Sequence, residues 1–298
     1  MKKAGPITGT FVDEITYDIP SSNWSKEQWK ADVDNMVDIG MDTLVFIRGG
    51  LKGKTIFPSK TIGTLDTDDF AGFIFDEAAK RNMDIYFGLY NTTIDWSGGN
   101  VAREVEINKP FIAEVMERYG DYPNFKGWYM SQECDFDRLN FKDMIHDMPA
   151  LLKDKTPEKE VLISPFFNSP ITVREPFSIP RLKEEWEMLF DRADGNVDIV
   201  AFQDGTAPLD QMEVYFGLID DLCKKHDMRH WVNVETFERD VRRMYWPIPF
   251  TDLRPKLEKH KQYAEKLITF EFSHFLSPQS IYESARNLNA LYKDYYLK

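Results

Sequence analysis

The sequence predicts a single-domain (β/α)8 TIM barrel, an α/β fold, on three observations. Short apolar segments recur along its 298 residues, amphipathic segments separate them, and the two kinds alternate eight times. Parallel strands joined by crossover helices produce this alternation, and eight repeats favour a closed barrel. An open, doubly wound sheet is the main rival, although no glycine-rich phosphate loop follows the first apolar segment.

The predicted strands are rich in β-branched and aromatic residues. They are 7–12, 43–49, 84–90, 125–133, 161–168, 198–205, 230–237 and 267–275. No linker rich in Pro, Gly or Ser interrupts the series, so residues 1–298 are expected to form one barrel domain.

The segments between these strands carry apolar residues at helical spacing. In 25–40, Ser25 and Gln28 predict a capping box, and in 66–82, Asp66 is the expected N-cap. The remaining predicted helices are 109–120, 141–154, 180–194, 208–226, 254–266 and 278–296.

The composition argues against several classes of binding partner. The net charge is −13 without a basic stripe, which disfavours nucleic acid and anionic membrane surfaces. No apolar run is long enough to cross a bilayer, and two cysteines make neither a disulfide framework nor a zinc site. A monomer is expected. No signal peptide is visible, which predicts a cytoplasmic protein, or a periplasmic or secreted one if a leader was removed.

Polar side chains stand at the C-terminal ends of the predicted strands, where this fold builds its active sites. From the first strand to the eighth they are Asp13 and Glu14, Arg48, Tyr90 and Asn91, Gln132 and Glu133, Asn168, Gln203 and Asp204, Glu235, and Glu271 and His274.

Alternation along a strand predicts which side chains face the barrel axis. Glu235 shares its side of the seventh strand with Trp231, while the valines at 232 and 234 take the side that suits the helices. In the fourth strand, Glu133 likewise shares its side with Tyr129. Both glutamates are therefore expected to point into the mouth of the barrel.

Two facing carboxyl groups are what the hydrolysis of a glycosidic bond requires. One carboxylic acid protonates the departing oxygen, and the other attacks the anomeric carbon or activates a water molecule. The two must have different pKa values, which burial and mutual repulsion can arrange. Glu133 and Glu235 are the predicted catalytic pair.

The motifs GWYMSQE, ISPFFN, AFQDG and WVNVETF resemble those of the large clan of retaining TIM-barrel glycosidases. In that clan the acid/base glutamate ends strand four and the nucleophile ends strand seven. More narrowly, the sequence is similar to an uncharacterised bacterial family of proposed glycoside hydrolases. The resemblance implies cleavage of an O-glycosidic bond with retention, with Glu133 as acid/base and Glu235 as nucleophile. It implies an oligo- or polysaccharide substrate and no metal or organic cofactor.

Arg48 stands where that clan often keeps an arginine that holds the nucleophile ionised. A guanidinium close to a carboxyl lowers its pKa and orients it. Two positions depart from the clan. Gln132 replaces the asparagine that usually precedes the acid/base, and Gln203 with Asp204 stand where a tyrosine is common.

The other strand-end side chains are candidates for sugar binding, together with aromatic rings in the loops, because rings stack on the apolar faces of sugars. The expected substrate-binding set is Arg48, Tyr90, Asn91, Trp96, Gln132, Asn168, Gln203, Asp204, Trp246 and His274.

Other interpretations stay open. The barrel could bind carbohydrate without cleaving it, or it could be a metal-assisted sugar-phosphate lyase or isomerase with Glu133, Asp204, Glu235 and His274 as ligands. Either catalytic candidate could instead be a structural ion-pair residue, which is the more usual role for a strand residue such as Glu271. The absence of a His-x-His pair, of a strand-end lysine and of a G-x-S-x-G elbow disfavours a zinc amidohydrolase, a Schiff-base aldolase and an α/β-hydrolase, respectively.

Overall fold

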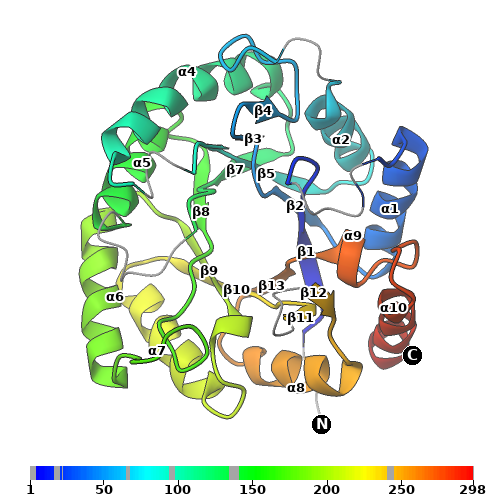
Figure 1. The fold of residues 1–298 in the computed structure, drawn as a ribbon, viewed down its shortest axis with the longest axis vertical. Coiled ribbons are helices and arrows are strands. Elements are labelled where there is room, and N and C mark those ends of the chain that lie inside the picture. Colours follow the sequence, from blue (N-terminus) through cyan, green and yellow to red (C-terminus); the bar gives the residue numbers. More distant parts are fainter. Residues whose placement is uncertain are drawn as a thin grey trace.

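Eight parallel strands close into a barrel in the computed structural model of the chain, which describes residues 5–16, 21, 23–64, 68–93, 98–133, 141–239 and 245–297. Around the barrel the strand order is β1, β2, β5, β7, β8, β9, β10 and β13, which returns to β1. In Figure 1 the strands form a central ring, and the helices form the outer layer around it. The predicted (β/α)8 fold is confirmed.

The barrel strands are β1 (Ile7–Val12), β2 (Thr43–Phe46), β5 (Asp84–Gly88), β7 (Phe125–Tyr129), β8 (Glu160–Ile163), β9 (Ile199–Gln203), β10 (Arg229–Asn233) and β13 (Lys266–Thr269). The helices are α1 (Lys26–Asp38), α2 (Phe70–Ala79), α4 (Val101–Tyr119), α5 (Phe141–Lys155), α6 (Ile179–Ala193), the 3-10 helix η1 (Asp204–Thr206), α7 (Met212–Lys225), α8 (Phe250–His260), α9 (Phe272–Phe275) and α10 (Glu283–Tyr296). Two small sheets are added: β3 (Gly50–Leu51) lies between β4 (Lys54–Thr55) and β6 (Tyr90–Asn91), and β11 (Phe237–Arg239) pairs with β12 (Tyr245–Pro247).

The first and last barrel strands complete the ring. Strand β1 runs parallel to β13, with Ile7 opposite Leu267. The Ile7 backbone N–H also donates to the Tyr292 hydroxyl on α10 at 2.7 Å. The two ends of the chain are thus bound to each other through strand pairing and through the last helix.

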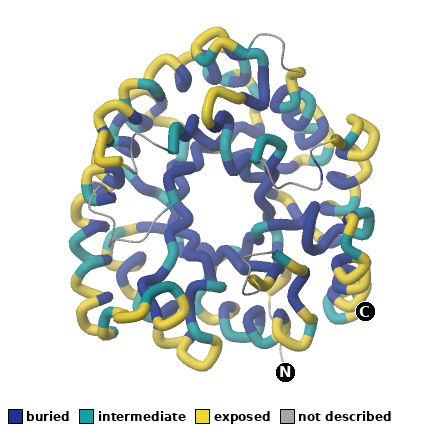
Figure 2. The backbone as a smooth tube through the Cα atoms, in the orientation of Figure 1, coloured by how far each residue is buried: buried dark blue, intermediate teal, exposed yellow. Residues whose placement is uncertain are grey.

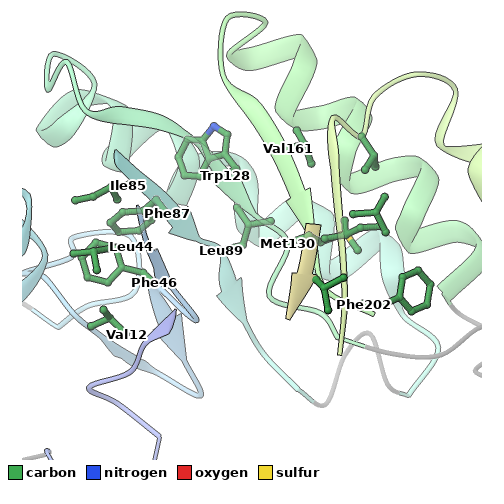
Figure 3. Close-up of a cluster of buried hydrophobic side chains, with 14 of the residues drawn as sticks. Val12, Leu44, Phe46, Ile85, Phe87, Leu89, Trp128, Met130, Val161 and Phe202 are labelled. Atoms are coloured by element: carbon green, nitrogen blue, oxygen red, sulfur yellow. The ribbon is translucent and has the colours of Figure 1, made fainter. Parts of the chain in front are cut away.

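Alternation along the strands divides the buried side chains into two cores. The inner core fills the barrel and includes Phe11, Val45, Tyr86, Tyr129, Leu162, Ala201, Trp231 and Ile268. The outer core lies between strands and helices, and Figure 3 labels Val12, Leu44, Phe46, Ile85, Phe87, Leu89, Trp128, Met130, Val161 and Phe202. In Figure 2 the ring of strands is buried almost throughout, whereas the outer faces of the helices are exposed.

The last barrel strand is shorter than the sequence suggests. Strand β13 ends at Thr269, and the chain then turns into the short helix α9, so His274 is helical and Glu271 precedes the helix. The aromatic residues of this segment favour a strand by propensity. The helix prevails because local bonds form instead, such as Leu276 N–H to the Phe272 carbonyl at 2.9 Å.

The helix starts were predicted with mixed success. Helix α1 has the expected capping box between Ser25 and Gln28. Asp66 lies outside the described residues, and the N-cap of α2 is Asp69, whose carboxylate accepts from the Gly72 N–H at 2.8 Å. Several aspartates precede this helix, and each can cap, so propensity alone could not choose among them.

Phe87→Ala should lower the free energy of unfolding by about 3–5 kcal/mol, because it leaves a cavity at a fully buried position of the outer core. Phe73→Ala is the matched control, since Phe73 is only partly buried against the same core and should cost clearly less. Urea denaturation measures both. Equal losses would contradict the packing described.

Candidate active site

Glu133 and Glu235 both follow barrel strands, β7 and β10, and continue the inward-facing side of each. Tyr129 and Trp231 on that side belong to the inner core, whereas Trp128 belongs to the outer core. The negative charge of Glu133 is also one of the causes that raise the pKa of Glu235. Two carboxyl groups that follow separate barrel strands therefore lie close enough for the charge of one to act on the other.

Glu133 is half-buried and is held by the strand that carries it. The Tyr129 hydroxyl donates a hydrogen bond to Glu133 Oε1. Tyr129 is fully buried, and burial followed by the charge of Glu133 raises the pKa of its phenol well above the usual value. Phe11 packs edge-on against it with 5.0 Å between ring centroids. Tyr129 is thus a fixed, protonated donor to Glu133.

Glu235 occupies a drier environment than Glu133. Its exposed fraction is only 4%. Burial is the largest cause that raises the pKa of its carboxyl to about 7; the charges of Arg239 and Lys256 oppose this shift, and those of Asp204 and Glu133 add to it. The carboxyl is therefore only partly ionised at neutral pH.

Arg239 is a cation that lies beside the Glu235 carboxyl. Its Nη2 atom lies 3.9 Å from Glu235 Oε1. The side chain starts from β11, and its guanidinium lies over the rings of Phe237 and Tyr245, 5.5 and 5.4 Å from their centroids. Contacts of this kind restrain the guanidinium beside the carboxyl.

Arg48 has a different partner from the one expected. Its Nη1 atom lies 3.9 Å from Asp13 Oδ2 and donates to Thr16 Oγ1 at 3.3 Å. Its positive charge acts on the Tyr129 phenol and opposes the rise in the pKa of that group. The role of holding the strand-seven glutamate ionised was expected of Arg48, but the arginine in contact with Glu235 is Arg239, and the Glu235 pKa is raised rather than lowered.

Asp204 is fully buried in a polar cluster beside Glu235. Lys256 Nζ lies 2.7 Å from Asp204 Oδ1, and His260 Nε2 lies 3.0 Å from Oδ2. Burial tends to raise the pKa of Asp204, but Lys256 and His260 together lower it below its usual value. Burial lowers the pKa of His260, so its neutral ring donates Nε2–H to the carboxylate. A buried, fully bonded carboxylate fits a positioning role better than the predicted sugar contact.

Five of the predicted sugar ligands are buried and bond to the protein itself. Their contacts are Tyr90 Oη accepting from Gly53 N–H (2.8 Å), Asn91 Nδ2 donating to the Ser131 carbonyl (3.0 Å), Gln132 Nε2 donating to Glu104 Oε1 (2.7 Å), Asn168 Oδ1 accepting from Phe177 N–H (3.0 Å), and Gln203 Nε2 donating to the Ser164 carbonyl (2.9 Å). These bonds fix the loops that surround the mouth.

His274 faces another buried carboxyl. Its Nδ1 atom contacts Glu271, and its Nε2 atom lies 3.4 Å from Ser21 Oγ. Glu271 is fully buried, and burial is the main cause of its raised pKa, which the charge of His274 opposes. The Glu271 carboxyl thus contacts a histidine, and the contact is an ion pair when His274 is protonated and Glu271 is ionised.

The predicted aromatic contacts are only partly described. Trp246 lies on β12 with an exposed fraction of 43% and packs edge-on against Tyr282 at 5.7 Å. It is partly exposed to solvent and lies on the strand that pairs with the one carrying Arg239. Trp96 lies outside the described residues.

Sequence reasoning missed two cationic residues near Glu235, Arg239 and Lys256, and the histidine His260 that binds Asp204. The last two interrupt the apolar stripe of α8 that includes Leu253 and Leu257. A lysine and a histidine one turn apart on a buried helix face are a usable signal, because buried cations need a partner. Arg239 left no comparable pattern.

Metal ligation was considered for Glu133, Asp204, Glu235 and His274. In the structure Asp204 is engaged by Lys256 and His260, and His274 faces Glu271. Within the described ranges, no three His, Cys, Asp or Glu side chains are arranged to hold a metal ion. The four residues therefore do not form one ligand set.

Across the described part of the chain, none of the helices combines the length and the apolar character that a membrane span requires.

Solved structures place the chain among barrels of known fold. A crystal structure from Bacteroides thetaiotaomicron, described as a putative alpha-L-fucosidase, is 37% identical, with 99% of this chain and 94% of that one covered and a TM-score of 0.92. An endo-1,4-beta-D-mannanase from Thermotoga petrophila shares the fold at 11% identity, with 97% and 99% covered and a TM-score of 0.64. A xylanase from Thermoanaerobacterium saccharolyticum does so at 13%, with 90% and 85% covered and a TM-score of 0.56.

No curated protein sequence matches the chain significantly. A family model does match, over residues 7–282, which span the barrel from β1 to the start of α10. The expected resemblance to glycoside hydrolase barrels and to an uncharacterised family is confirmed by these likenesses. The chain belongs to the family described as Domain of unknown function (DUF4434).

Proposed function

We propose that the protein is a retaining glycoside hydrolase in which Glu133 and Glu235 are the catalytic carboxyl groups. The observation that supports this proposal is that the charge of Glu133 acts on Glu235, while the two carboxyls lie in unlike environments after two different barrel strands. Glu133 is half-buried and bonded to Tyr129, whereas Glu235 is buried with a pKa of about 7 and feels the charge of Glu133. Two carboxyls in unlike environments can take the two different roles that glycoside cleavage requires.

In the proposed reaction the Glu235 carboxylate attacks the anomeric carbon while Glu133 gives its proton to the departing oxygen. The glycosidic bond breaks, and a glycosyl ester forms on Glu235. Water then attacks the same carbon and gives its proton to Glu133. The ester bond breaks, both side chains return to their starting states, and two displacements leave the anomeric configuration unchanged.

The relative from Bacteroides thetaiotaomicron supports a starting choice of substrate. Because it is 37% identical over 99% of this chain and is described as a putative alpha-L-fucosidase, aryl α-L-fucosides are the first substrates to test. Aryl xylosides and mannosides follow in the panel. Trp246, with its exposed ring, is a proposed sugar-stacking residue.

Glu133→Gln and Glu235→Gln should each lower kcat by about 10²-fold or more, because each removes a group that acts on the bond being cleaved. Turnover of the first aryl glycoside that the wild type cleaves provides the measurement. Glu238→Gln is the control, since Glu238 is an exposed neighbour on β11. Wild-type turnover by either catalytic variant would end the proposal.

Azide separates the two roles within the same experiment. In Glu133→Ala, azide should attack the ester on Glu235 and give a glycosyl azide of retained configuration. In Glu235→Ala it should attack the substrate directly and give the inverted product. Proton NMR of the products distinguishes the two outcomes, and the opposite pattern would exchange the assigned roles.

The acid limb of kcat/KM should lie near pH 7, because attack requires ionised Glu235 and burial raises its pKa to about 7. Arg239→Gln should move this limb to higher pH, since it removes a charge that favours the carboxylate. Rate profiles from pH 4 to 9 test this. A limb that does not move would mean that Arg239 has no influence on the reacting carboxyl.

Glu235→Gln should raise thermal stability at pH 8 relative to wild type, but not at pH 5. Folding raises the pKa of Glu235 from its ordinary value of 4.5 to about 7, so the folded chain resists ionisation of this group. Wild type therefore loses up to about 3 kcal/mol as the pH rises through that window, and glutamine avoids the loss. Melting temperatures at the two pH values measure the effect. An equal difference in melting temperature between variant and wild type at both pH values would contradict the raised pKa of Glu235.

A further inference from the structure

We propose that Asp204, Gly205 and Lys256 form a seat that positions Glu235, so that its carboxyl is presented to the substrate in one fixed orientation. The three residues come from two elements that sequence reasoning did not connect, namely η1 and α8. The inference rests on the proposed role of Glu235. It assigns positioning residues, none of which needs to touch the substrate.

The first part of the seat holds the backbone of Glu235. Its N–H donates to Asp204 Oδ1 at 2.9 Å, and its carbonyl accepts from Lys256 Nζ at 3.1 Å. Lys256 and Asp204 are themselves joined at 2.7 Å, and their exposed fractions are 7% and 0%. One buried ion pair therefore binds both polar backbone groups of Glu235, and such bonds are strong when shielded from water.

The second part of the seat supports the Glu235 side chain. A Cβ atom added at Gly205 would lie 1.8 Å from Glu235 Oε2 and 2.5 Å from its Cδ. The carboxyl thus rests directly on the backbone of Gly205, which only a residue without a side chain allows. Gly205 is not among the glycines with positive φ, so the approach of Glu235, rather than the backbone conformation, is what requires glycine here.

The third part keeps Asp204 from turning. His260 Nε2 lies 3.0 Å from Asp204 Oδ2, and the His260 ring packs edge-on against Phe216 at 4.4 Å between centroids. Both oxygens of Asp204 are therefore bound, one by Lys256 and one by His260. These two donors lie one helical turn apart on α8, so the helix aligns the acceptor that in turn aligns Glu235.

Gly205→Ala tests the seat directly. The obstructing atoms are the end of a side chain, so the variant should fold by displacing the Glu235 carboxyl. We expect kcat to fall by about 10²-fold, with little change in KM or in melting temperature, because misplacement of a reacting group by about 1 Å has that effect. Gly217→Ala is the matched control, since its added Cβ would meet only Tyr263 at an ordinary 3.4 Å.

Asp204→Asn provides a second test, with a readout that a purely structural role would not move. It keeps an acceptor for the Glu235 N–H but removes a negative charge. Among the described residues, the other charged groups that act on Glu235 include Arg239 on β11, Lys256 on α8 and Glu133 after β7. Without the charge of Asp204, Glu235 ionises more readily, so the acid limb of kcat/KM should move to lower pH.

A wild-type kcat in Gly205→Ala would overturn the seat, and so would an unmoved acid limb in Asp204→Asn. If one of these two variants does not fold, the other still tests the proposal. If the wild type cleaves no glycoside, the proposed function fails, but the seat remains testable through thermal melting. The pH at which Glu235→Gln begins to gain stability should then be lower in the Asp204→Asn background. An unchanged pH would overturn the seat independently of activity.

Discussion

The geometry of the mouth depends on one buried ion pair, between Lys256 and Asp204. Taking two charges out of water is unfavourable unless they meet each other and further hydrogen-bonding groups. Here the further groups are the backbone of Glu235 and the ring of His260. The requirement that these charges be satisfied thus fixes the position of a third residue, Glu235. Its own carboxyl lies 3.9 Å from the Arg239 guanidinium.

The remaining strand-end side chains divide into two groups by what they contact. The buried amides and Tyr90 bond to backbone or to buried partners, and they hold loops in place. Glu133, Arg239 and Trp246 keep surface that solvent or a ligand can reach. The barrel mouth is therefore lined by fixed side chains, of which few are accessible. Such a site is consistent with chemistry that depends on the exact position of its reacting groups more than on the number of contacts with a substrate.

The sequence predicted the barrel because its evidence is local and repeated: strand and helix periodicities alternate eight times, and side-chain alternation points Glu133 and Glu235 inward. It failed where a contact depends on tertiary packing. Which arginine meets Glu235 is decided by the β11–β12 hairpin, and no pattern distinguishes Arg239 from Arg48. The partner of the buried polar residues on α8 was likewise not predictable, because Lys256 meets Asp204 across 52 positions of the sequence. The segment containing His274 has strand propensity but forms a helix through its own short-range bonds.

The pairing of β1 with β13 has a consequence for how the protein is made. Ile7 can contact Leu267 and Tyr292 only after the chain up to α10 has left the ribosome. The first strand must therefore wait, with one of its edges unpaired and Phe11 not yet enclosed, until the last strand is synthesised. The ring closes only after β13 has been synthesised, and the site at the mouth cannot exist on the nascent chain before that.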